Sequence, residues 1–168
     1  MTDGIYLLLG SNLGDKRNNL VKARKLIEDL VGIIDKSSSI YETDAWGKVL
    51  QPTFLNQVVK ISSWLTPEDL LVAIQQIEIS LGRIRHEKWG ERTIDIDILY
   101  YSGQIIKLPN LVIPHPEIQF RRFTLIPLAE ISPQLIHPVL QKSNKQLLIL
   151  CADNLAVKPL TPYGEKIN

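Results

Sequence analysis

The sequence predicts an α+β domain with a ferredoxin-like, split β-α-β core followed by additional C-terminal strands and helices. Two observations lead to this fold class. Hydrophobic spacing up to Tyr101 changes between the strand and helix periods in the order strand, helix, strand, strand, helix, strand, which is the order of that topology. A length of 168 residues with 45% hydrophobic side chains suits one sizeable core, so residues 1–168 are expected to form a single domain.

Composition argues against several function classes. The net charge is +1, and acidic residues interrupt even the basic segment 83–92, so we expect no broad surface for nucleic acid. Cys151 is the only cysteine and the three histidines are dispersed, which excludes an internal disulfide and argues against a structural zinc site. No stretch approaches the roughly 18 apolar residues of a membrane span. A cytoplasmic monomer without a nucleic-acid or membrane partner is therefore expected.

The first elements are a strand, a turn and a helix. A short apolar run at 5–9 predicts a buried, central strand, and a turn at 11–14 follows it. Asp15 can cap the next helix, whose apolar residues recur at helical spacing until Gly32. Backbone N–H groups of the turn could hold a phosphate, but the turn lacks the Gly-Lys-Ser/Thr of a P-loop. Its spacing favours a plain strand-to-helix turn.

Two strands are predicted next, a weak one at 33–41 and a stronger one at 54–64, with a long loop at 42–52 between them. Strand alternation places Phe54 and Asn56 on one face. These residues could stack on a flat heteroaromatic ring and read its polar edge. They could also be a core aromatic and an amide that satisfies a nearby turn, and the pattern alone favours this ordinary packing.

A second helix begins at Thr66 and Pro67, which are typical N-terminal residues. Its core stripe recurs at helical spacing as far as Leu81. Gln75 and Glu78 flank this stripe near its C-terminal end, so each is expected to face either a ligand or solvent. Spacing alone favours solvent.

The stretch from Leu81 to Tyr101 carries the chemistry. It opens with cations and one tryptophan in a segment without an apolar period, which predicts a mobile loop: Arg83, Arg85, Lys88, Trp89 and Arg92. From Thr93 the residues alternate, so Asp95 and Asp97 point the same way, about 6 to 7 Å apart along a strand. Such carboxylates can converge on one divalent ion or a close pair, while guanidinium groups bind phosphate. The carboxylates alone would also suit a solvated strand face, but the adjoining arginines favour phosphoryl transfer.

The remaining elements are predicted in order from their spacing. They are an edge strand at 104–108, a helix at 120–130 interrupted at Pro127, a helix at 143–151 and a strand at 156–160. The 120–130 helix is expected to carry Arg121 and Phe123. Between these elements, the segment Pro114-His115-Pro116 either holds His115 in one direction or is an ordinary loop.

Four blocks occur in order along nearly the whole chain: LLLGSNLGD, QPTFLNQVV, LGRIRHEKWGERTIDID and PHPEIQFRRFTLIPLAEISP. Together they resemble the 6-hydroxymethyl-7,8-dihydropterin pyrophosphokinase family of folate biosynthesis. The resemblance implies an ATP-dependent 2-amino-4-hydroxy-6-hydroxymethyldihydropteridine diphosphokinase. Such an enzyme transfers pyrophosphate from ATP to the hydroxymethyl oxygen of the pterin and releases AMP.

The same resemblance implies the site residues. Two Mg²⁺ ions would be held with ATP by Asp95 and Asp97, and the catalytic residues would be Arg83, Arg92, Asp95 and Asp97. The residues expected to bind ATP are Gln75, Glu78, Arg83, Arg85, Lys88, Trp89, Arg92, His115 and Arg121. The residues expected to bind the pterin are Thr43, Trp46, Phe54, Asn56, Trp89, Asp95 and Phe123. The loop with Trp89 is expected to close over both substrates.

The chain departs from the family pattern at several positions. Relatives commonly have other residues where this chain has Asp44, Ala45, Lys88, Glu91, Asn110 and Val112. The alternative function is another Mg²⁺-dependent nucleotidyl or phosphoryl transferase, or a nuclease, that uses the Asp95 and Asp97 pair. An RNA-binding module is disfavoured because the central strands lack paired exposed aromatics for stacking bases.

Overall fold

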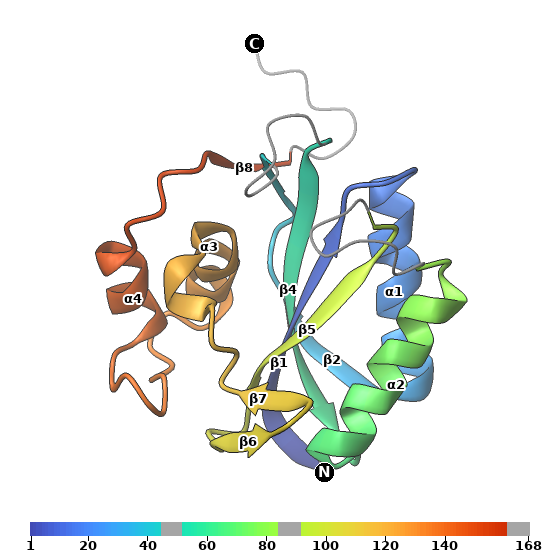
Figure 1. Cartoon of the computed structure of the whole chain (residues 1–168), viewed down its shortest axis with the longest axis horizontal. Coiled ribbons are helices and arrows are strands. Elements are labelled where there is room, and N and C mark those ends of the chain that lie inside the picture. The colour runs from blue at the N-terminus through green and yellow to red at the C-terminus, as the bar shows by residue number, and fades with distance from the viewer. Residues whose placement is uncertain (45–51, 84–91, 161–168) are drawn as a thin grey trace.

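The computed structural model describes residues 1–44, 52–83 and 92–160 (Figure 1). Within these residues the main sheet has the strand order β5 (Asp95–Tyr101), β1 (Thr2–Ser11), β4 (Phe54–Ser63), β3 (Tyr41–Thr43) and β8 (Val157–Pro159), and β2 (Gly32–Ser37) also pairs with β4. Each of these pairings is antiparallel. The predicted central position of the first strand is confirmed, since β1 lies between β5 and β4.

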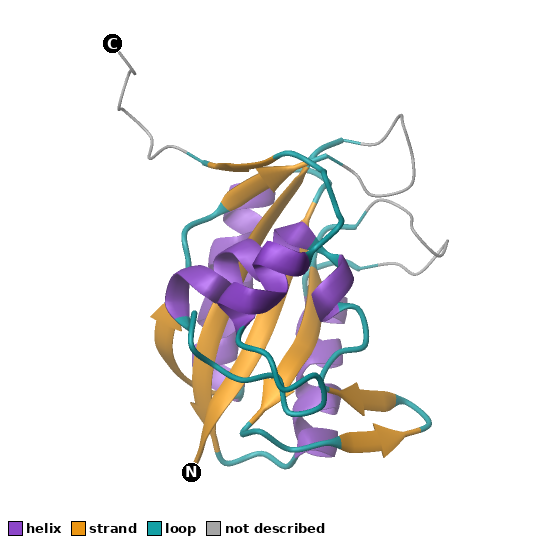
Figure 2. Ribbon diagram, turned by 90° about the vertical axis from the view of Figure 1, so that its left-hand side faces the viewer, coloured by secondary structure: helices purple, strands orange, loops and turns teal. Residues whose placement is uncertain are grey.

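Helices cover both faces of the sheet. Helices α1 (Lys16–Leu30) and α2 (Pro67–Ser80) pack on one face, and α3 (Arg122–Ile131) and α4 (Asn144–Leu150) pack on the other (Figures 1 and 2). β1 supplies a core on each side: Ile5, Leu7 and Leu9 join the cluster with α1 and α2, whereas Tyr6 and Leu8 join the cluster with α3. Burial on both faces explains why this strand is continuously apolar. No helix among the described residues has the length and hydropathy to cross a membrane.

Both predicted N-terminal caps are present. The Asp15 side chain accepts a hydrogen bond from Asn18 N at the start of α1, and the Thr66 hydroxyl accepts one from Asp69 N at the start of α2. Each satisfies a backbone donor that the first helical turn leaves without an intrahelical partner. These caps fix where the two helices begin relative to the strands that precede them.

The single strand predicted at 33–41 is wrong, because the chain leaves the ladder at Ser38 and resumes as β3. Ser38 N still donates to Val58 O at 2.9 Å, but the Ser38 hydroxyl takes over as acceptor for Val58 N at 3.0 Å. The Gln57 amide then donates to Ser38 O at 2.8 Å. These side-chain bonds replace strand pairing and separate β2 from β3.

Two expectations for the second half need correction. The strand predicted at 104–108 is β6 (Ile106–Leu108), and it pairs with β7 (Leu111–Ile113) in a separate two-stranded sheet rather than lying at the edge of the main sheet. Pro127 does not interrupt the predicted helix, since α3 runs through it. Proline there removes only one intrahelical donor, and its buried ring packs inside the fold. A short 3₁₀ helix at Ile118–Phe120 precedes α3.

Candidate active site

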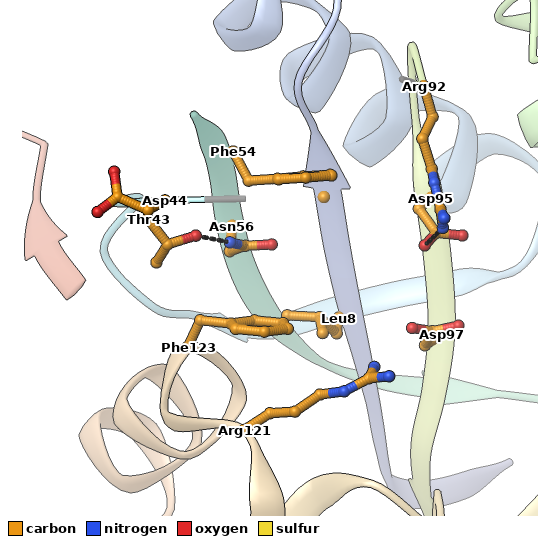
Figure 3. Close-up of a pocket in the computed structure, with 11 residues that line it drawn as sticks. Leu8, Thr43, Asp44, Phe54, Asn56, Arg92, Asp95, Asp97, Arg121 and Phe123 are labelled. Carbon is orange, nitrogen blue, oxygen red and sulfur yellow. Dashed lines mark hydrogen bonds and ion pairs between the residues drawn. The ribbon is translucent and has the colours of Figure 1, made fainter. Parts of the chain in front are cut away.

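A pocket opens at the end of the sheet where β1 finishes and where β4 and β5 begin (Figure 3). Strand alternation points polar and aromatic side chains from these neighbouring strands into one space. The predicted residues that line it are Thr43, Phe54, Asn56, Arg92, Asp95, Asp97, Arg121 and Phe123, and Leu8, Gly10 and Asp44 complete the lining. Residues far apart in sequence therefore meet in one site.

One half of the pocket is aromatic. Phe54 from β4 and Phe123 from α3 lie on opposite sides of the opening, and the Asn56 amide lies between them (Figure 3). Asn56 is 4% exposed, and its Nδ2 donates to the Thr43 hydroxyl at 2.9 Å. Two aromatic faces with an amide between them suit a flat ring that carries polar atoms on its edge.

The other half is acidic. Asp95 and Asp97 point into the pocket from β5, as predicted, while Ile94, Ile96 and Ile98 are buried on the other side of the strand. Asp95 accepts from Arg83 Nη1 at 2.7 Å through Oδ1 and from Arg92 Nη1 at 2.5 Å through Oδ2. The two arginines that the sequence analysis assigned to phosphate thus bind a carboxylate in this structure.

Glu78 supports this arrangement from α2. Its Oε1 accepts hydrogen bonds from Arg83 Nη1 and, at 2.7 Å, from the backbone N–H of Ile96. The residue is 3% exposed, so of the two alternatives for Glu78, a ligand or solvent, the solvent position that spacing alone favours is wrong. Burial raises its pKa from the ordinary value, while the hydrogen bond from Ile96 opposes this effect. Glu78 joins α2, β5 and Arg83 in one buried network.

Asp97 has a different electrostatic environment from Asp95. Burial and, after it, the neighbouring Asp95 carboxylate raise the pKa of Asp97 from 3.8 to about 7. Arg121 acts in the opposite direction. Asp95 and Asp97 thus lie side by side, and Asp97 ionises less readily than an ordinary aspartate. A divalent cation bound between them would stabilise the ionised form of both carboxylates.

His115 approaches Asp97 from the segment after β7. Its backbone N–H donates to Leu99 O at 2.9 Å, and its Nδ1 accepts from Glu117 N at 3.2 Å. These bonds leave Nε2 facing Asp97, with 4.0 Å between Nε2 and Oδ2. Burial, and then Arg121, lower the pKa of His115 to about 4. A neutral imidazole, held in one direction, therefore borders the acidic half.

Carboxylates of this kind fit magnesium. Among the described residues no group of three or more His, Cys, Asp or Glu side chains gathers closely enough to hold a metal by itself. Mg²⁺ usually takes only one or two protein carboxylates and fills its remaining positions with phosphate oxygens and water. Asp95 and Asp97 match that donor set.

The other predicted residues lie around or outside this pocket. Gln75 lines a neighbouring hollow together with Glu78, Ile79 and Arg83. A second hollow beyond Asp97 is lined by His115, Asn110 and Val112. Asn110 and Val112 are two of the positions at which this chain departs from the family pattern. Trp46, Arg85, Lys88 and Trp89 lie outside the described residues, as do the predicted mobile loop between Arg83 and Arg92 and its closure.

Sequence reasoning missed Gly10 and Asn12. A Cβ at Gly10 would lie 3.0 Å from Asn56 Oδ1 and 3.9 Å from Phe54 Cδ1, so the glycine keeps the pocket open. A glycine ending an apolar strand was the only local signal for it. Asn12 contacts Arg92 across the chain, and nothing in the sequence around either residue indicates that contact.

Comparison with known proteins identifies a consistent group. The family profile of 7,8-dihydro-6-hydroxymethylpterin-pyrophosphokinase (HPPK) matches residues 6–133. The chain is 43% identical over 142 residues to the 2-amino-4-hydroxy-6-hydroxymethyldihydropteridine pyrophosphokinase of Aquifex aeolicus, which covers 84% of this chain and 88% of that protein. The enzyme of the same name from Bacillus subtilis is 44% identical over 136 residues, or 80% of this chain and 81% of that protein.

The fold is similar to solved structures as well. A Plasmodium falciparum HPPK-DHPS crystal structure superposes with a TM-score of 0.68 at 21% sequence identity. The match covers 89% of this chain but only 43% of that longer chain. At this identity the superposition supports the fold alone.

Proposed function

The chain belongs to the 7,8-dihydro-6-hydroxymethylpterin-pyrophosphokinase family, and from this membership we infer that it is the pyrophosphokinase of folate biosynthesis. The enzyme transfers pyrophosphate to 6-hydroxymethyl-7,8-dihydropterin. We propose ATP as the donor, with attack by the hydroxymethyl oxygen on the β-phosphorus. The bond between that phosphorus and the oxygen bridging to the α-phosphate then breaks, and AMP leaves.

The observation that carries this proposal is the division of one pocket into an aromatic half and an acidic half. Phe54 and Phe123 lie across from Asp95 and Asp97 in the same space. A pterin between the two rings would direct its hydroxymethyl group toward the carboxylates. Catalysis of phosphoryl transfer depends mainly on such positioning and on electrostatic stabilisation.

The pterin is proposed to stack between Phe54 and Phe123, with Asn56 reading its edge. Thr43 holds the amide nitrogen of Asn56, which supports a role for the amide oxygen as an acceptor toward the ring. Asp95, Trp46 and Trp89 are the other pterin contacts that we carry over from the family resemblance.

Asp95 and Asp97 would hold two Mg²⁺ ions together with the polyphosphate. When bound, the cations would neutralise phosphate charge and polarise the reacting phosphoryl group. The raised pKa of Asp97 supports this assignment, because burial and the adjacent Asp95 carboxylate both disfavour its charged form, and a bound divalent cation would favour it. Asp97 is thus expected to ionise fully when the cation binds.

Arg83 and Arg92 are proposed to stabilise the charge of the triphosphate. Both are on Asp95 in the free protein, so Asp95 keeps them aimed at the site. With Asp95 engaged in holding a cation, the phosphate oxygens of ATP would be the better partners for the two guanidinium groups. Gln75, Glu78, Arg85, Lys88, Trp89, His115 and Arg121 are the further proposed contacts to ATP.

Three broader features belong to the same proposal. The order β5, β1, β4, β2 supports a ferredoxin-like core, since antiparallel pairing joins these strands in turn. Residues 1–168 are proposed to act as one domain. A cytoplasmic location, expected from composition, and a monomeric state are part of the same proposal.

Product analysis tests the reaction. Incubation of the protein with ATP, Mg²⁺ and 6-hydroxymethyl-7,8-dihydropterin should give equal amounts of AMP and pterin diphosphate by ³¹P nuclear magnetic resonance. ADP with a pterin monophosphate, or pyrophosphate with an adenylylated product, would contradict the proposal. Either of these outcomes would favour the alternative of another phosphoryl or nucleotidyl transferase that uses Asp95 and Asp97.

A further inference from the structure

Asn12 and Arg92 form two hydrogen bonds across 80 positions of sequence. The Arg92 backbone N–H donates to Asn12 Oδ1 at 2.8 Å, and the Asn12 backbone N–H donates to Arg92 O at 3.2 Å. Both backbone polar groups of Arg92 are therefore bound by one residue. The contact joins the turn after β1 to the segment that leads into β5.

This contact lies just beyond the last regular pair of β1 and β5. The ladder between β1 and β5 ends where Gly10 faces Asp95. Past that point the Asn12 carboxamide oxygen substitutes for a backbone carbonyl and binds the Arg92 N–H, as asparagine side chains do in local turns. Arg92 is thereby held against the turn after β1 although it precedes β5.

The turn that carries Asn12 is itself braced. Asn19 on α1 donates through Nδ2 to the Ser11 hydroxyl at 3.1 Å and to Leu13 O at 2.9 Å. Gly14 has a φ of +67°, which lets the chain reverse into α1. Asn12 is 1% exposed, and its Nδ2 has no hydrogen-bond partner among the described residues. Among the described residues, the Asn12 side chain therefore makes its hydrogen bond, to the Arg92 N–H, through its oxygen.

The Arg92 side chain begins at the backbone that Asn12 holds and ends on Asp95. Its Nη1 lies 2.5 Å from Asp95 Oδ2 (Figure 3). One end of the arginine is thus fixed by Asn12 and the other by the carboxylate. If phosphate replaces Asp95 as a partner of the guanidinium group, the two hydrogen bonds between Asn12 and the Arg92 backbone can stay intact.

We propose that Asn12 is a positioning residue that aims Arg92 at the transferred phosphoryl group. This inference rests on the proposed function, because Arg92 matters to turnover only if the site transfers phosphate. Asn12 does not touch the substrates. Its effect passes through the backbone of Arg92, and it should therefore vanish when the guanidinium group is removed.

A double-mutant cycle tests this dependence. Asn12→Ala should lower kcat roughly 10- to 100-fold, because misplacing a catalytic group by about 1 Å has effects of this size. Arg92→Ala should lower kcat roughly 100- to 1,000-fold, as loss of one aimed charge-stabilising donor does. In the Arg92→Ala background, Asn12→Ala should change kcat by less than about threefold, because residues that act as a unit are not additive.

Asn19→Ala is the matched control. It removes the side-chain bonds to Ser11 and Leu13 O but leaves both hydrogen bonds between Asn12 and Arg92 in place, so it should lower the thermal stability while its effect on kcat stays small and combines additively with Arg92→Ala. Asn12→Asp is the second variant, and it covers the case in which Asn12→Ala does not fold. Aspartate keeps the accepting oxygen, so Arg92→Ala should reduce kcat by the same factor in that background as in the native protein.

Amide hydrogen exchange gives a readout that needs no turnover. In free Asn12→Ala protein the Arg92 N–H should exchange roughly five- to tenfold faster, the factor for one lost hydrogen bond, while the Ile96 N–H on Glu78 keeps its protection. The proposal would be overturned if Asn12→Ala lowered kcat by the same factor in the native and in the Arg92→Ala backgrounds. An unchanged exchange rate of the Arg92 N–H in Asn12→Ala would overturn it as well. A native protein without pyrophosphoryl transfer would instead overturn the proposed function, since the exchange result does not depend on it.

Discussion

The amide of Asn56 donates to the hydroxyl of Thr43 at 2.9 Å across the neighbouring strands β3 and β4. This bond uses one of the two N–H donors of the amide and leaves the amide oxygen beside Gly10, where a Cβ would lie 3.0 Å from it. Asn56 is buried, so its orientation is set by Thr43 rather than by solvent. The pocket therefore presents a fixed acceptor to its ligand.

Thr43→Val should weaken pterin binding without weakening ATP binding. Valine keeps the shape of threonine but cannot accept the Asn56 hydrogen bond, so a buried donor is left unsatisfied and the amide is free to rotate. The expected loss is about 1 to 3 kcal/mol of pterin binding energy, measured by calorimetric titration of each ligand. Thr53→Val is the matched control, because among the described residues the Thr53 hydroxyl accepts its hydrogen bond from Lys16, at 3.0 Å, and not from Asn56. An equal loss in the control would show a general effect of removing a hydroxyl.

Gly10→Ala should also impair pterin binding selectively. The added methyl group would press on Asn56 Oδ1 at 3.0 Å, and Thr43 resists movement of the amide away from it. We expect pterin affinity to fall by about tenfold or more, equivalent to about 1.4 kcal/mol, while ATP affinity stays within about twofold. Unchanged pterin affinity would mean that the ligand does not reach this end of the pocket.

Glu78→Ala should destabilise the fold, since Glu78 binds both Arg83 and the Ile96 N–H in the interior. Removing it leaves the Ile96 donor without this acceptor and Arg83 without one of its two carboxylates. The expected loss is about 2 to 4 kcal/mol in the free energy of unfolding, measured with denaturant. Gln76→Ala, at an exposed position on the same helix, should change it by less than about 0.5 kcal/mol. A similar small effect for Glu78→Ala would show that the network adds nothing to stability.

Much of the fold follows from hydrophobic spacing. Strand alternation correctly predicted the shared face of Asp95 and Asp97, and helix caps at Asp15 and Thr66 marked two helix starts. The errors arise where side chains replace regular pairing. Ser38 interrupts a strand through its own hydroxyl, and no hydrophobic pattern records such a bond. The short strand β7 was missed because three residues are too few to establish a period.

The candidate site was predictable only where its residues share an element or a motif. Phe54 and Asn56 lie on one strand, so alternation places them together, whereas Phe123 meets them only through packing of α3 on the sheet. Glu78 looked solvent-facing because helical spacing does not reveal that Arg83 and a strand N–H will surround it. The contact between Asn12 and Arg92 depends on strand pairing at long range, which spacing cannot supply.

Asp97 should give the free protein a distinct dependence of stability on pH. Its pKa rises from 3.8 in the unfolded chain to about 7 in the fold, so the folded protein holds a proton that the unfolded chain has released. This contribution to stability is complete below about pH 4 and is lost as the pH rises toward about 7. His115, whose pKa falls from 6.5 to about 4, acts in the opposite direction, because its unfolded form binds a proton over that range.

Asp97→Asn should therefore make the free energy of unfolding increase more steeply with pH between about 4 and 7 than it does in the native protein. The difference in slope approaches about 1.4 kcal/mol per pH unit when one proton is involved. Denaturant titrations without Mg²⁺ or nucleotide provide the measurement, since a bound cation would favour the ionised carboxylate. Parallel curves for the two proteins would show that Asp97 titrates in the fold as it does in the unfolded chain.

Pyrophosphoryl transfer is proposed to depend on Asp95 and Asp97. The buried face of β5 is formed by Ile96 and Ile98, both 4% exposed, so Asp97→Ala removes a functional group and leaves the core intact. The most direct measurement is the single-turnover rate of AMP formation in Asp97→Ala, with saturating ATP, pterin and Mg²⁺ and with thermal unfolding as the check on folding. We predict a folded protein in which the rate falls by at least about 1,000-fold, since a cation-binding carboxylate supplies several kcal/mol of transition-state stabilisation. A folded Asp97→Ala protein with a near-native, Mg²⁺-dependent rate would contradict the assignment of Asp97 to cation binding.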